Sequence, residues 1–272
     1  MRTTLKATPL RVFSLDPGRA ARSMSIAATY DELRLTTYAS RPDVAARIET
    51  RRADHARGLR FDDVGYFNRI YDWGSGAGAE ELLEMFSGGS VHPAFYLGLV
   101  GEPPGSTGSW CRGEAYSWLE APLAHCRPVT TATPIRTPEP GEHEAFLQTY
   151  LRAFGANVHS FPVAIRNMRL LFDVPQLHFL MATSPEGILS IGMLFKHGDT
   201  AMLSAGSTLE AYRGRGCHMA LIGARLHLAR RLGCRRIASW AVADSESESN
   251  MRRQGLELVA RTASWKLKRL SR

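Results

Sequence analysis

A glycine-rich turn that leads straight into a helix-like run carries the residue types that bind phosphate. The turn reads Arg-Gly-Arg-Gly over residues 213–216, and the run begins at Cys217. The first amide groups of a helix have no partner within the helix and lie at the positive end of its dipole, so they form a site for an anion. Glycine lets the backbone approach the ligand, and arginine adds charge-assisted hydrogen bonds to phosphate. We therefore predict a diphosphate-binding turn.

The elements around this turn must hold its amide groups in place. Three β-rich runs precede it, separated by short turns at residues 185–187 and 197–199 that are typical of hairpins. The helix after the turn places Leu221 and Ala224 on one face and ends at Gly233. The elements predicted for this half are a helix over residues 144–154, a helix or helical lid over 161–172, strands over 177–183, 188–196 and 202–210, the helix after the turn, a strand over 237–243, a helix over 247–254 and a strand or hairpin over 256–267.

The first half of the chain is less regular. Residues 41–58 begin with Pro42 in a first-turn position and then space Val44 and Ile48 as one apolar face, which predicts a helix. We expect extended chain over residues 59–73, a short helix over 80–86, and strands over 91–100 and from 116 onward. These runs indicate that the first half also mixes helices and strands.

Two segments divide the chain. Residues 128–142 are rich in proline and predict a boundary, part of which also forms the first strand of the second half. Residues 1–23 hold five arginine and lysine residues but no apolar core of signal-peptide length, so we expect a disordered extension, with Met24 as an alternative start. The predicted divisions are therefore an extension over 1–23, a domain over 24–127 and a domain over 128–272.

The composition is that of an ordinary globular protein, with 44% hydrophobic and 22% charged residues among 272. The net charge of +8 favours anionic ligands, but the charges are scattered and form no basic run, so nucleic acid is not an expected partner. The four cysteines show no metal-ligand spacing, so we expect no metal and reduced thiols, as in a cytoplasmic protein. No apolar run reaches the length of about 18 residues that spans a membrane.

Two motifs together resemble the GNAT superfamily of acetyl-CoA-dependent N-acetyltransferases. The family's diphosphate turn, Arg/Gln-x-x-Gly-x-Gly/Ala, is matched by residues 213–218, except that His218 replaces the last small residue. Residues 249–256 are similar to the family's asparagine-containing helix that runs into Lys/Arg-x-Gly-Phe. The resemblance covers residues 130–272 and implies an α/β (α+β) GNAT fold, with a mixed, mostly antiparallel central sheet flanked by helices.

The resemblance implies an N-acetyltransferase in which a primary amine attacks the thioester of acetyl-CoA directly, in a ternary complex. The strand over residues 202–210 would bind the pantetheine arm through main-chain hydrogen bonds, in a splayed gap beside the strand over 237–243. A backbone amide near Thr208 would polarise the thioester carbonyl. The implied cofactor-binding residues are Ser207, Thr208, Leu209, Arg213, Gly214, Arg215, Gly216, Cys217, His218 and Asn250.

The proton-handling residues are less well defined by the motif. Many family members place a tyrosine acid four residues before the motif's glycine, and here that position is Met251, which cannot donate a proton. Ser247 or Ser249 is the candidate acid, directly or through water, and no single base stands out. A second hypothesis is therefore a catalytically silent acyl-CoA-binding module that acts through protein partners.

Residues 24–127 resemble a degenerate GNAT-like domain, because they have the element types but no phosphate turn. In this tandem arrangement the first domain packs on the second and shapes the acceptor site. We expect the acceptor to be a small-molecule amine or a protein or peptide amine. The sequence leaves open whether the protein forms a homodimer. We expect the side chains of His218 and Arg225 on the surface and Cys217 as a buried thiol.

Overall fold

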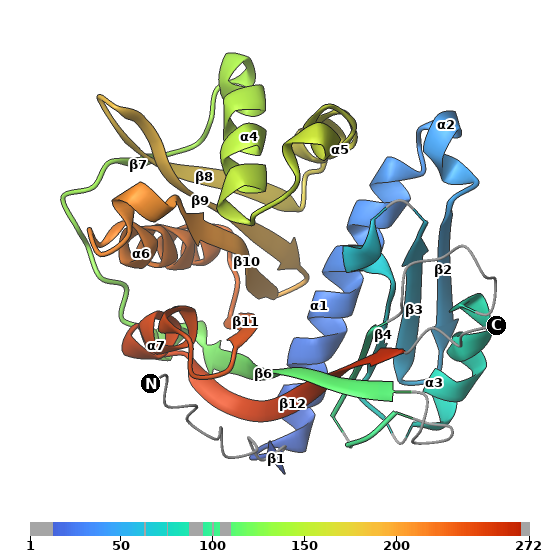
Figure 1. The fold of residues 1–272 in the computed structure, drawn as a ribbon. Coiled ribbons are helices and arrows are strands. Elements are labelled where there is room, and N and C mark those ends of the chain that lie inside the picture. The colour runs from blue at the N-terminus through green and yellow to red at the C-terminus, as the bar shows by residue number, and fades with distance from the viewer. Residues whose placement is uncertain are drawn as a thin grey trace, which may run out of the picture.

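One continuous sheet of twelve strands runs through the part of the chain that this computed structural model describes, residues 13–62, 64–74, 76–86, 95–99, 101–103 and 110–267 (Figure 1). Its strand order is β2-β3-β4-β5-β12-β6-β11-β10-β9-β8-β7, and β1 pairs with β12. The strands are β1 (Phe13–Ser14), β2 (Ile48–Ala53), β3 (Ala56–Phe61), β4 (Arg69–Asp72), β5 (Phe95–Gly98), β6 (Trp110–Pro122), β7 (Ile135–Arg136), β8 (Leu177–Ser184), β9 (Gly187–His197), β10 (Thr200–Thr208), β11 (Arg236–Val242) and β12 (Glu257–Leu267). The helices are α1 (Pro17–Tyr38), α2 (Pro42–Ala45), α3 (Ala77–Leu82), α4 (His143–Ala153), α5 (Phe161–Met168), α6 (Cys217–Arg231) and α7 (Glu246–Arg253).

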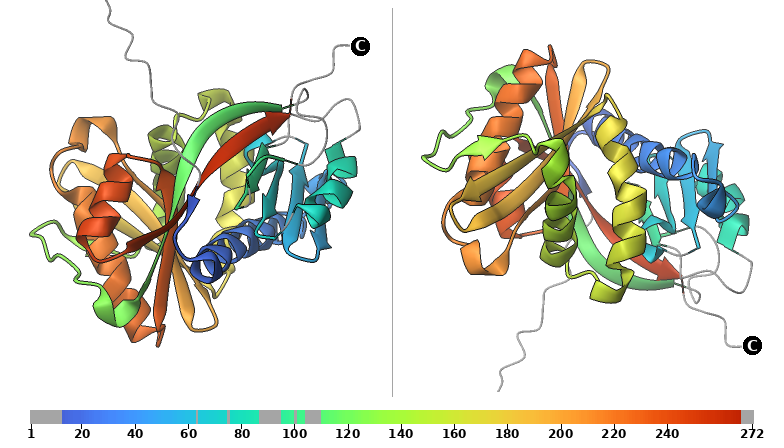
Figure 2. Two further views of the ribbon diagram at one scale, coloured as in Figure 1. Left: turned by 90° about the horizontal axis from the view of Figure 1, so that it is seen from below. Right: turned by 90° about the horizontal axis from the view of Figure 1, so that it is seen from above.

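The two halves of the chain exchange one long strand each, β6 and β12. Strand β6 belongs to the first half in sequence but lies between β11 and β12, whereas β12 lies between β5 and β6. Both strands arch across the two halves of the molecule (Figures 1 and 2). The mixed, mostly antiparallel sheet flanked by helices agrees with the predicted fold class, and the division at residue 127 stays a prediction because β6 and β12 are shared.

Strands β8, β9 and β10 are covered by helices on both faces. Phe179 and Met193 pack in the core that contains α4, while their neighbours Leu180 and Leu194 pack against residues of α6. Successive side chains of a strand point to opposite faces, so α4 and α6 lie on opposite sides of this part of the sheet. The strands therefore read as nearly continuous apolar runs, and the sequence pattern predicted them within a few residues.

Helix α1 lies between the two halves and joins their cores (Figure 1). It begins where Pro17 takes a first-turn position and the Asp16 carboxylate accepts the amide of Arg19 at 3.0 Å. The predicted disordered extension over residues 1–23 is therefore wrong from Phe13 onward, because β1 pairs with β12 and α1 buries Ala20 and Met24. Residues 1–12 lie outside the described part of the chain.

The helix predicted over residues 41–58 is also wrong. Only α2 is helical there, and β2 and β3 form a hairpin whose second strand pairs with β4. Pairing with distant chain outweighs the apolar spacing that favoured a helix. The strand predicted over 91–100 contains β5, and its residues 91–94 and 100 lie outside the described ranges. No helix in the described ranges is both long and apolar enough to span a bilayer.

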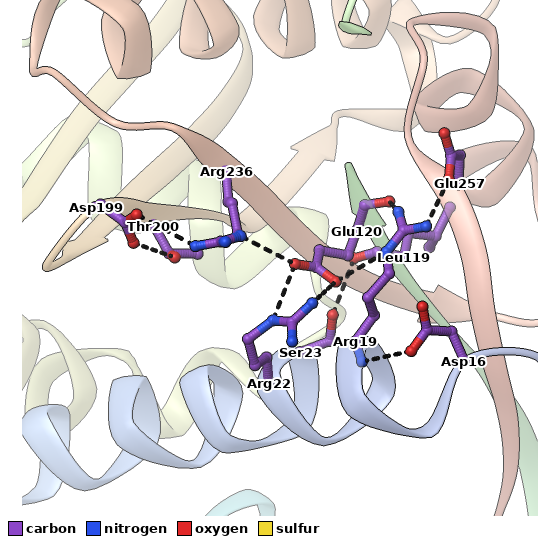
Figure 3. A network of polar contacts seen from close by, with 10 residues as sticks. All are labelled: Asp16, Arg19, Arg22, Ser23, Leu119, Glu120, Asp199, Thr200, Arg236 and Glu257. Atoms are coloured by element: carbon purple, nitrogen blue, oxygen red, sulfur yellow. Dashed lines mark hydrogen bonds and ion pairs between the residues drawn. The ribbon is translucent and has the colours of Figure 1, made fainter. Parts of the chain in front are cut away.

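A buried carboxylate fixes α1 to the exchanged strands (Figure 3). Glu120 on β6 is 3% exposed, and its Oε2 lies 3.1 Å from Nε of Arg19 and 3.3 Å from Nη2 of Arg22. Arg236 of β11 approaches the other carboxylate oxygen at 3.9 Å. The Nη1 atom of Arg19 also reaches Glu257 of β12 at 2.7 Å. This network holds α1 where it can form one wall of a cavity between the halves.

Glu120→Gln is expected to lower the free energy of unfolding by about 2 kcal/mol, because the buried carboxylate that pairs with all three arginines loses its charge. Urea-induced unfolding measures the change. Glu257→Gln is the matched control: its side chain is 52% exposed, and an exposed ion pair contributes roughly 0–1 kcal/mol. Equal losses in the two variants would contradict a special role for Glu120.

Candidate functional site

The predicted phosphate turn forms the head of α6. Gly214 has φ +73° and Gly216 has φ +78°, in the left-handed region that favours glycine. Gly216 is the N-cap, and no side chain caps the helix, so the first-turn amides of α6 are left for another acceptor. A Cβ atom at either glycine would have nothing within 4 Å, which shows open space in front of the turn. The geometry fits the phosphates of a nucleotide-type ligand.

A cavity of about 350 Å³ lies against this turn. It is lined by eight of the predicted cofactor residues: Ser207, Thr208, Arg213, Gly214, Gly216, Cys217, His218 and Asn250. Leu209 and Arg215 do not line it: the Leu209 amide donates to the carbonyl of Leu189 at 3.0 Å, and the Arg215 guanidinium lies over the Tyr212 ring at 5.2 Å. Arg253 of α7 lines it as a further cation that the sequence reasoning missed.

Strand β10 separates from β11 after Met202, shortly before the part of β10 that lines this cavity. Residues Thr200–Met202 pair in parallel with Arg236–Ala238, and beyond Met202 the edge of β10 that faces β11 pairs with no strand in the described part of the chain. The pairing of β10 with β9 shifts between Ser204 and Ser207, and Ala205 within this bulge has φ +48°. A non-glycine residue in the left-handed region is strained, and such strain gathers at functional sites. The predicted splay is present, and its bulge centres on Ala205 and Gly206.

A buried arginine, Arg225, hydrogen-bonds to the backbone beside the bulge of β10. Arg225 of α6 is 2% exposed, and its Nη1 donates to the carbonyls of Met193 and Ser204, both at 3.1 Å. Its guanidinium lies 2.9 Å from where a Cβ would sit at Gly192 or Gly206, so a side chain at either position would have to displace the guanidinium from its carbonyl partners. Burial lowers the pKa of Arg225 to about 10, which leaves it charged at neutral pH. The predicted surface position of Arg225 is therefore wrong.

His218 is half-buried rather than exposed on the surface as predicted. Its Nδ1 lies 3.2 Å from Nδ2 of Asn250, whose Oδ1 accepts from Nη1 of Arg253 at 3.0 Å. The arginine thus turns the amide NH₂ of Asn250 toward the imidazole, so Nδ1 of His218 accepts and Nε2 carries the proton. That Nε2 lies 3.4 Å from the Cβ position of Gly206 and faces the bulge. The chain from Arg253 through Asn250 orients a neutral imidazole as a hydrogen-bond donor.

Burial, together with the charge of Arg225, lowers the pKa of His218 from 6.5 to about 4. The unfolded chain then binds more protons than the folded protein between these values, so stability falls as pH falls from 6.5 to 4. Over that range the wild type is expected to lose roughly 3 kcal/mol more than His218→Gln, measured by urea unfolding at each pH. His227→Gln, which alters an exposed histidine of the same helix, should keep the wild-type dependence. An equal loss of stability between pH 6.5 and 4 in all three proteins would contradict the lowered pKa of His218.

A second cavity of about 670 Å³ opens from the first. Gly206, His218 and Ser247 line both, so the bulge and the imidazole stand at the junction. The larger cavity lies between the two halves: α1 and the segment after β3 contribute Tyr30, Arg34 and Phe67 to its wall. The first half of the chain therefore shapes a space that begins beside the phosphate turn.

The two predicted proton donors occupy different places. Ser247 stands at the junction of the cavities, whereas Ser249, half-buried on the same helix, lines neither of them. Met251 is buried and lines the larger cavity, so a thioether occupies the position where the family motif often has tyrosine. Among the predicted donors, the geometry leaves Ser247 beside the junction.

Comparison with known proteins identifies the fold. No family model and no curated protein sequence matches the chain. Among solved structures, a GCN5-related N-acetyltransferase from Kribbella flavida aligns with 89% of this chain and 95% of its own, at 14% identity and a TM-score of 0.58. A tandem GNAT protein from the clavulanic acid biosynthesis pathway aligns with 96% of this chain and 99% of its own, at 12% identity and a TM-score of 0.57. A conserved protein of unknown function from Staphylococcus epidermidis aligns with 84% of this chain and 97% of its own, at 9% identity and a TM-score of 0.61.

Proposed function

We propose that this chain, which has the fold of the tandem GNAT proteins, is an N-acetyltransferase that moves an acetyl group from acetyl-CoA to a primary amine. The observation that carries the proposal is the junction of the two cavities. The smaller one begins at an uncapped helix N-terminus suited to phosphate, and the larger one begins where β10 bulges away from its neighbours. A donor substrate and an acceptor can therefore meet at Gly206, as direct transfer in a ternary complex requires.

The residues of the smaller cavity fit the parts of acetyl-CoA. The amides of the first turn of α6 and the guanidinium of Arg213 would bind the diphosphate. The unpaired edge of β10 beside Ser207 and Thr208 would bind the amides of the pantetheine arm, in the manner of an added strand. This arrangement would bring the thioester to the bulge, where the chain turns from one cavity into the other.

His218 and Ser247 supply the polar groups at that point. When the amine attacks, a nitrogen–carbon bond forms and negative charge develops on the carbonyl oxygen. The Nε2–H of a neutral, oriented His218 can stabilise that charge without releasing its own proton. The carbon–sulfur bond then breaks and the carbonyl re-forms, the nitrogen loses a proton to water, and the thiolate takes a proton from water, either directly or through the Ser247 hydroxyl, which regains one from water as it gives its own away.

Binding of acyl-CoA without transfer is the second hypothesis, and Met251 is the observation that favours it. The buried thioether cannot donate a proton to the leaving thiolate. A protein that uses this site only to sense acyl-CoA would bind the ligand and release no thiol in the presence of any amine.

Calorimetric titration separates these possibilities. Acetyl-CoA and CoA are expected to bind with micromolar dissociation constants, which correspond to a favourable binding free energy on the order of 8 kcal/mol. ATP is expected to bind more weakly because it lacks the pantetheine arm. Release of free thiol on adding a panel of primary amines would support transfer. Saturable binding without thiol release would favour the silent module, and no binding of either CoA compound would overturn both hypotheses.

A further inference from the structure

The wall that α1 contributes to the larger cavity contains a buried cluster of charge. Arg34 is 5% exposed and its Nη1 lies 3.3 Å from Oδ1 of Asp31. The other oxygen of Asp31 accepts the Tyr71 hydroxyl at 2.7 Å and lies 3.8 Å from Nη1 of Arg69. Two buried guanidiniums thus share one buried carboxylate. Burial of unbalanced charge is costly, so the excess positive charge calls for an anion.

The remaining charges near the cavity do not balance this excess. Among the described residues that line the cavity, Arg34 and Arg225 are cations and no aspartate or glutamate is present. Among the described residues, the hydrogen-bond partners of Arg225 are backbone carbonyls. Of the nearest acids, Glu32 pairs with arginines of β2 and β3, and Glu114 is an exposed residue whose carboxylate contacts the Tyr116 hydroxyl at 3.5 Å. The wall is therefore positive at Arg34, whose side chain is itself buried.

Unused hydrogen-bonding atoms of the cluster point to the same kind of ligand. The Nε of Arg34 and the hydroxyl of Tyr38 are buried; the Arg34 side chain lies within hydrogen-bonding reach of that hydroxyl, and no carboxylate or carbonyl among the described residues accepts from either atom. The two residues are four apart on α1, so they lie on one face of the helix, and both line the cavity. A guanidinium and a hydroxyl side by side suit a carboxylate, since both donate to its oxygens.

The rest of the wall is aromatic. The Arg34 guanidinium lies 4.7 Å from the centre of the Phe67 ring and 5.2 Å from that of Tyr30. Trp240 of β11 and Tyr150 of α4 line the same space. Such walls favour a flat apolar body, and a volume of about 670 Å³ is that of a site for a small organic molecule.

We propose that the acceptor is a primary amine on an aromatic body that also carries a carboxylate, which Arg34 and Tyr38 bind in the larger cavity. This inference rests on the proposed function for the role of the amine, whereas the carboxylate site stands on the charge cluster itself. An amine without its own negative charge enters as an ammonium ion and is repelled by Arg34 and Arg225. A carboxylate on the same molecule removes that repulsion and neutralises the buried excess.

Binding of matched pairs of probes tests the carboxylate directly. The pairs are 4-(aminomethyl)benzoate with 4-(aminomethyl)benzamide, and 3-phenylpropionate with 3-phenylpropionamide, measured by calorimetry with and without CoA. In each pair the carboxylate is expected to bind at least roughly tenfold more tightly than the amide, as a charge-assisted hydrogen bond implies. If each amide binds as tightly as its carboxylate, or if no carboxylate binds at millimolar concentration, the inference is overturned.

Two variants test whether Arg34 causes the preference for the carboxylate probes over the amide probes. Arg34→Met keeps an apolar chain against the aromatic rings and should reduce the preference for carboxylate to less than about threefold. Arg52→Met removes the same charge from an exposed arginine of β2 that pairs with Glu32, and should keep the wild-type preference. A preference that survives Arg34→Met would contradict the site. Should Arg34→Met fail to fold, Arg34→Lys is measured, which keeps the charge but loses the forked donor and should weaken the preference.

The same samples separate this inference from the proposed function. Acetyl-CoA binding is measured on each protein, and Arg34→Met should leave it unchanged because Arg34 does not line the smaller cavity. Loss of carboxylate preference with intact acetyl-CoA binding would support both proposals. Carboxylate preference in a protein that binds no acetyl-CoA would overturn the proposed function and leave the anionic site standing.

Discussion

Gly216→Val is expected to abolish measurable acetyl-CoA binding, with a dissociation constant at least about 100-fold above that of the wild type. The reason is local. Gly216 holds φ +78° at the N-cap of α6, and the space beside it is open, so a side chain there would stand where the phosphates bind. A branched residue would also shift the backbone and turn the first amides of the helix away from the ligand. Calorimetric titration of acetyl-CoA measures the loss.

Gly198→Val controls for strain alone. Gly198 lies between β9 and β10 with φ +59°, also with nothing within 4 Å of its Cβ position, but it lines neither cavity. It should lose stability to a similar degree and bind acetyl-CoA as the wild type does. Thermal unfolding of both variants checks that they are folded. Wild-type affinity in a folded Gly216→Val protein would remove the argument for the phosphate turn.

His218→Ala is expected to lower kcat for acetyl transfer on the order of 100-fold, while the dissociation constant for acetyl-CoA changes less than about threefold. A donor that acts on the charge of the transition state contributes to turnover much more than to binding. The lost group is the Nε2–H that faces Gly206, which Asn250 and Arg253 orient. Steady-state kinetics by thiol release, together with calorimetry, gives both constants.

His218→Gln separates the donor from the bulk of the ring. Glutamine keeps an N–H group of similar reach, so it should recover part of the lost kcat, whereas a role in packing alone would give equal losses in the two variants. Because the pKa of His218 is about 4, the imidazole is neutral throughout the working range, and its titration should leave no inflection between pH 6 and 8 in kcat. Undiminished kcat in His218→Ala would contradict the proposed role.

Local patterns were sufficient for the second half of the chain. Strands β8, β9 and β10 are apolar runs divided by turns at Gly187 and Gly198, and both glycines adopt positive φ. The glycine turn predicted to bind phosphate was located for the same reason, since two glycines before a helix are a short-range signal. Such features depend on neighbouring residues and need no knowledge of distant ones.

Two buried arginines were missed although the sequence contains a signal for them. Leu221, Arg225 and Ala229 are spaced four apart, and the outer two belong to the buried face of α6, so Arg225 must be buried with them. On α1, Arg34 stands between Tyr30 and Tyr38 at the same spacing. The predicted surface position of Arg225 followed from its charge, because arginine is seldom buried without a partner. Here backbone carbonyls at the bulge supply the partners.

The sequence by itself determined the GNAT fold of residues 130–272, the glycine turn at the head of α6 and the presence of methionine where the motif often has tyrosine, since these features are encoded in short spans. Only the tertiary structure decided that β6 and β12 are exchanged, that α1 lines a cavity between the halves, and that His218 faces the bulge at Gly206. Each of these depends on residues far apart in sequence, such as His218 with Asn250 or Arg34 with Arg69. Strand exchange and the pairing of buried charges reflect the lowest free energy of the whole chain, and no local periodicity encodes them.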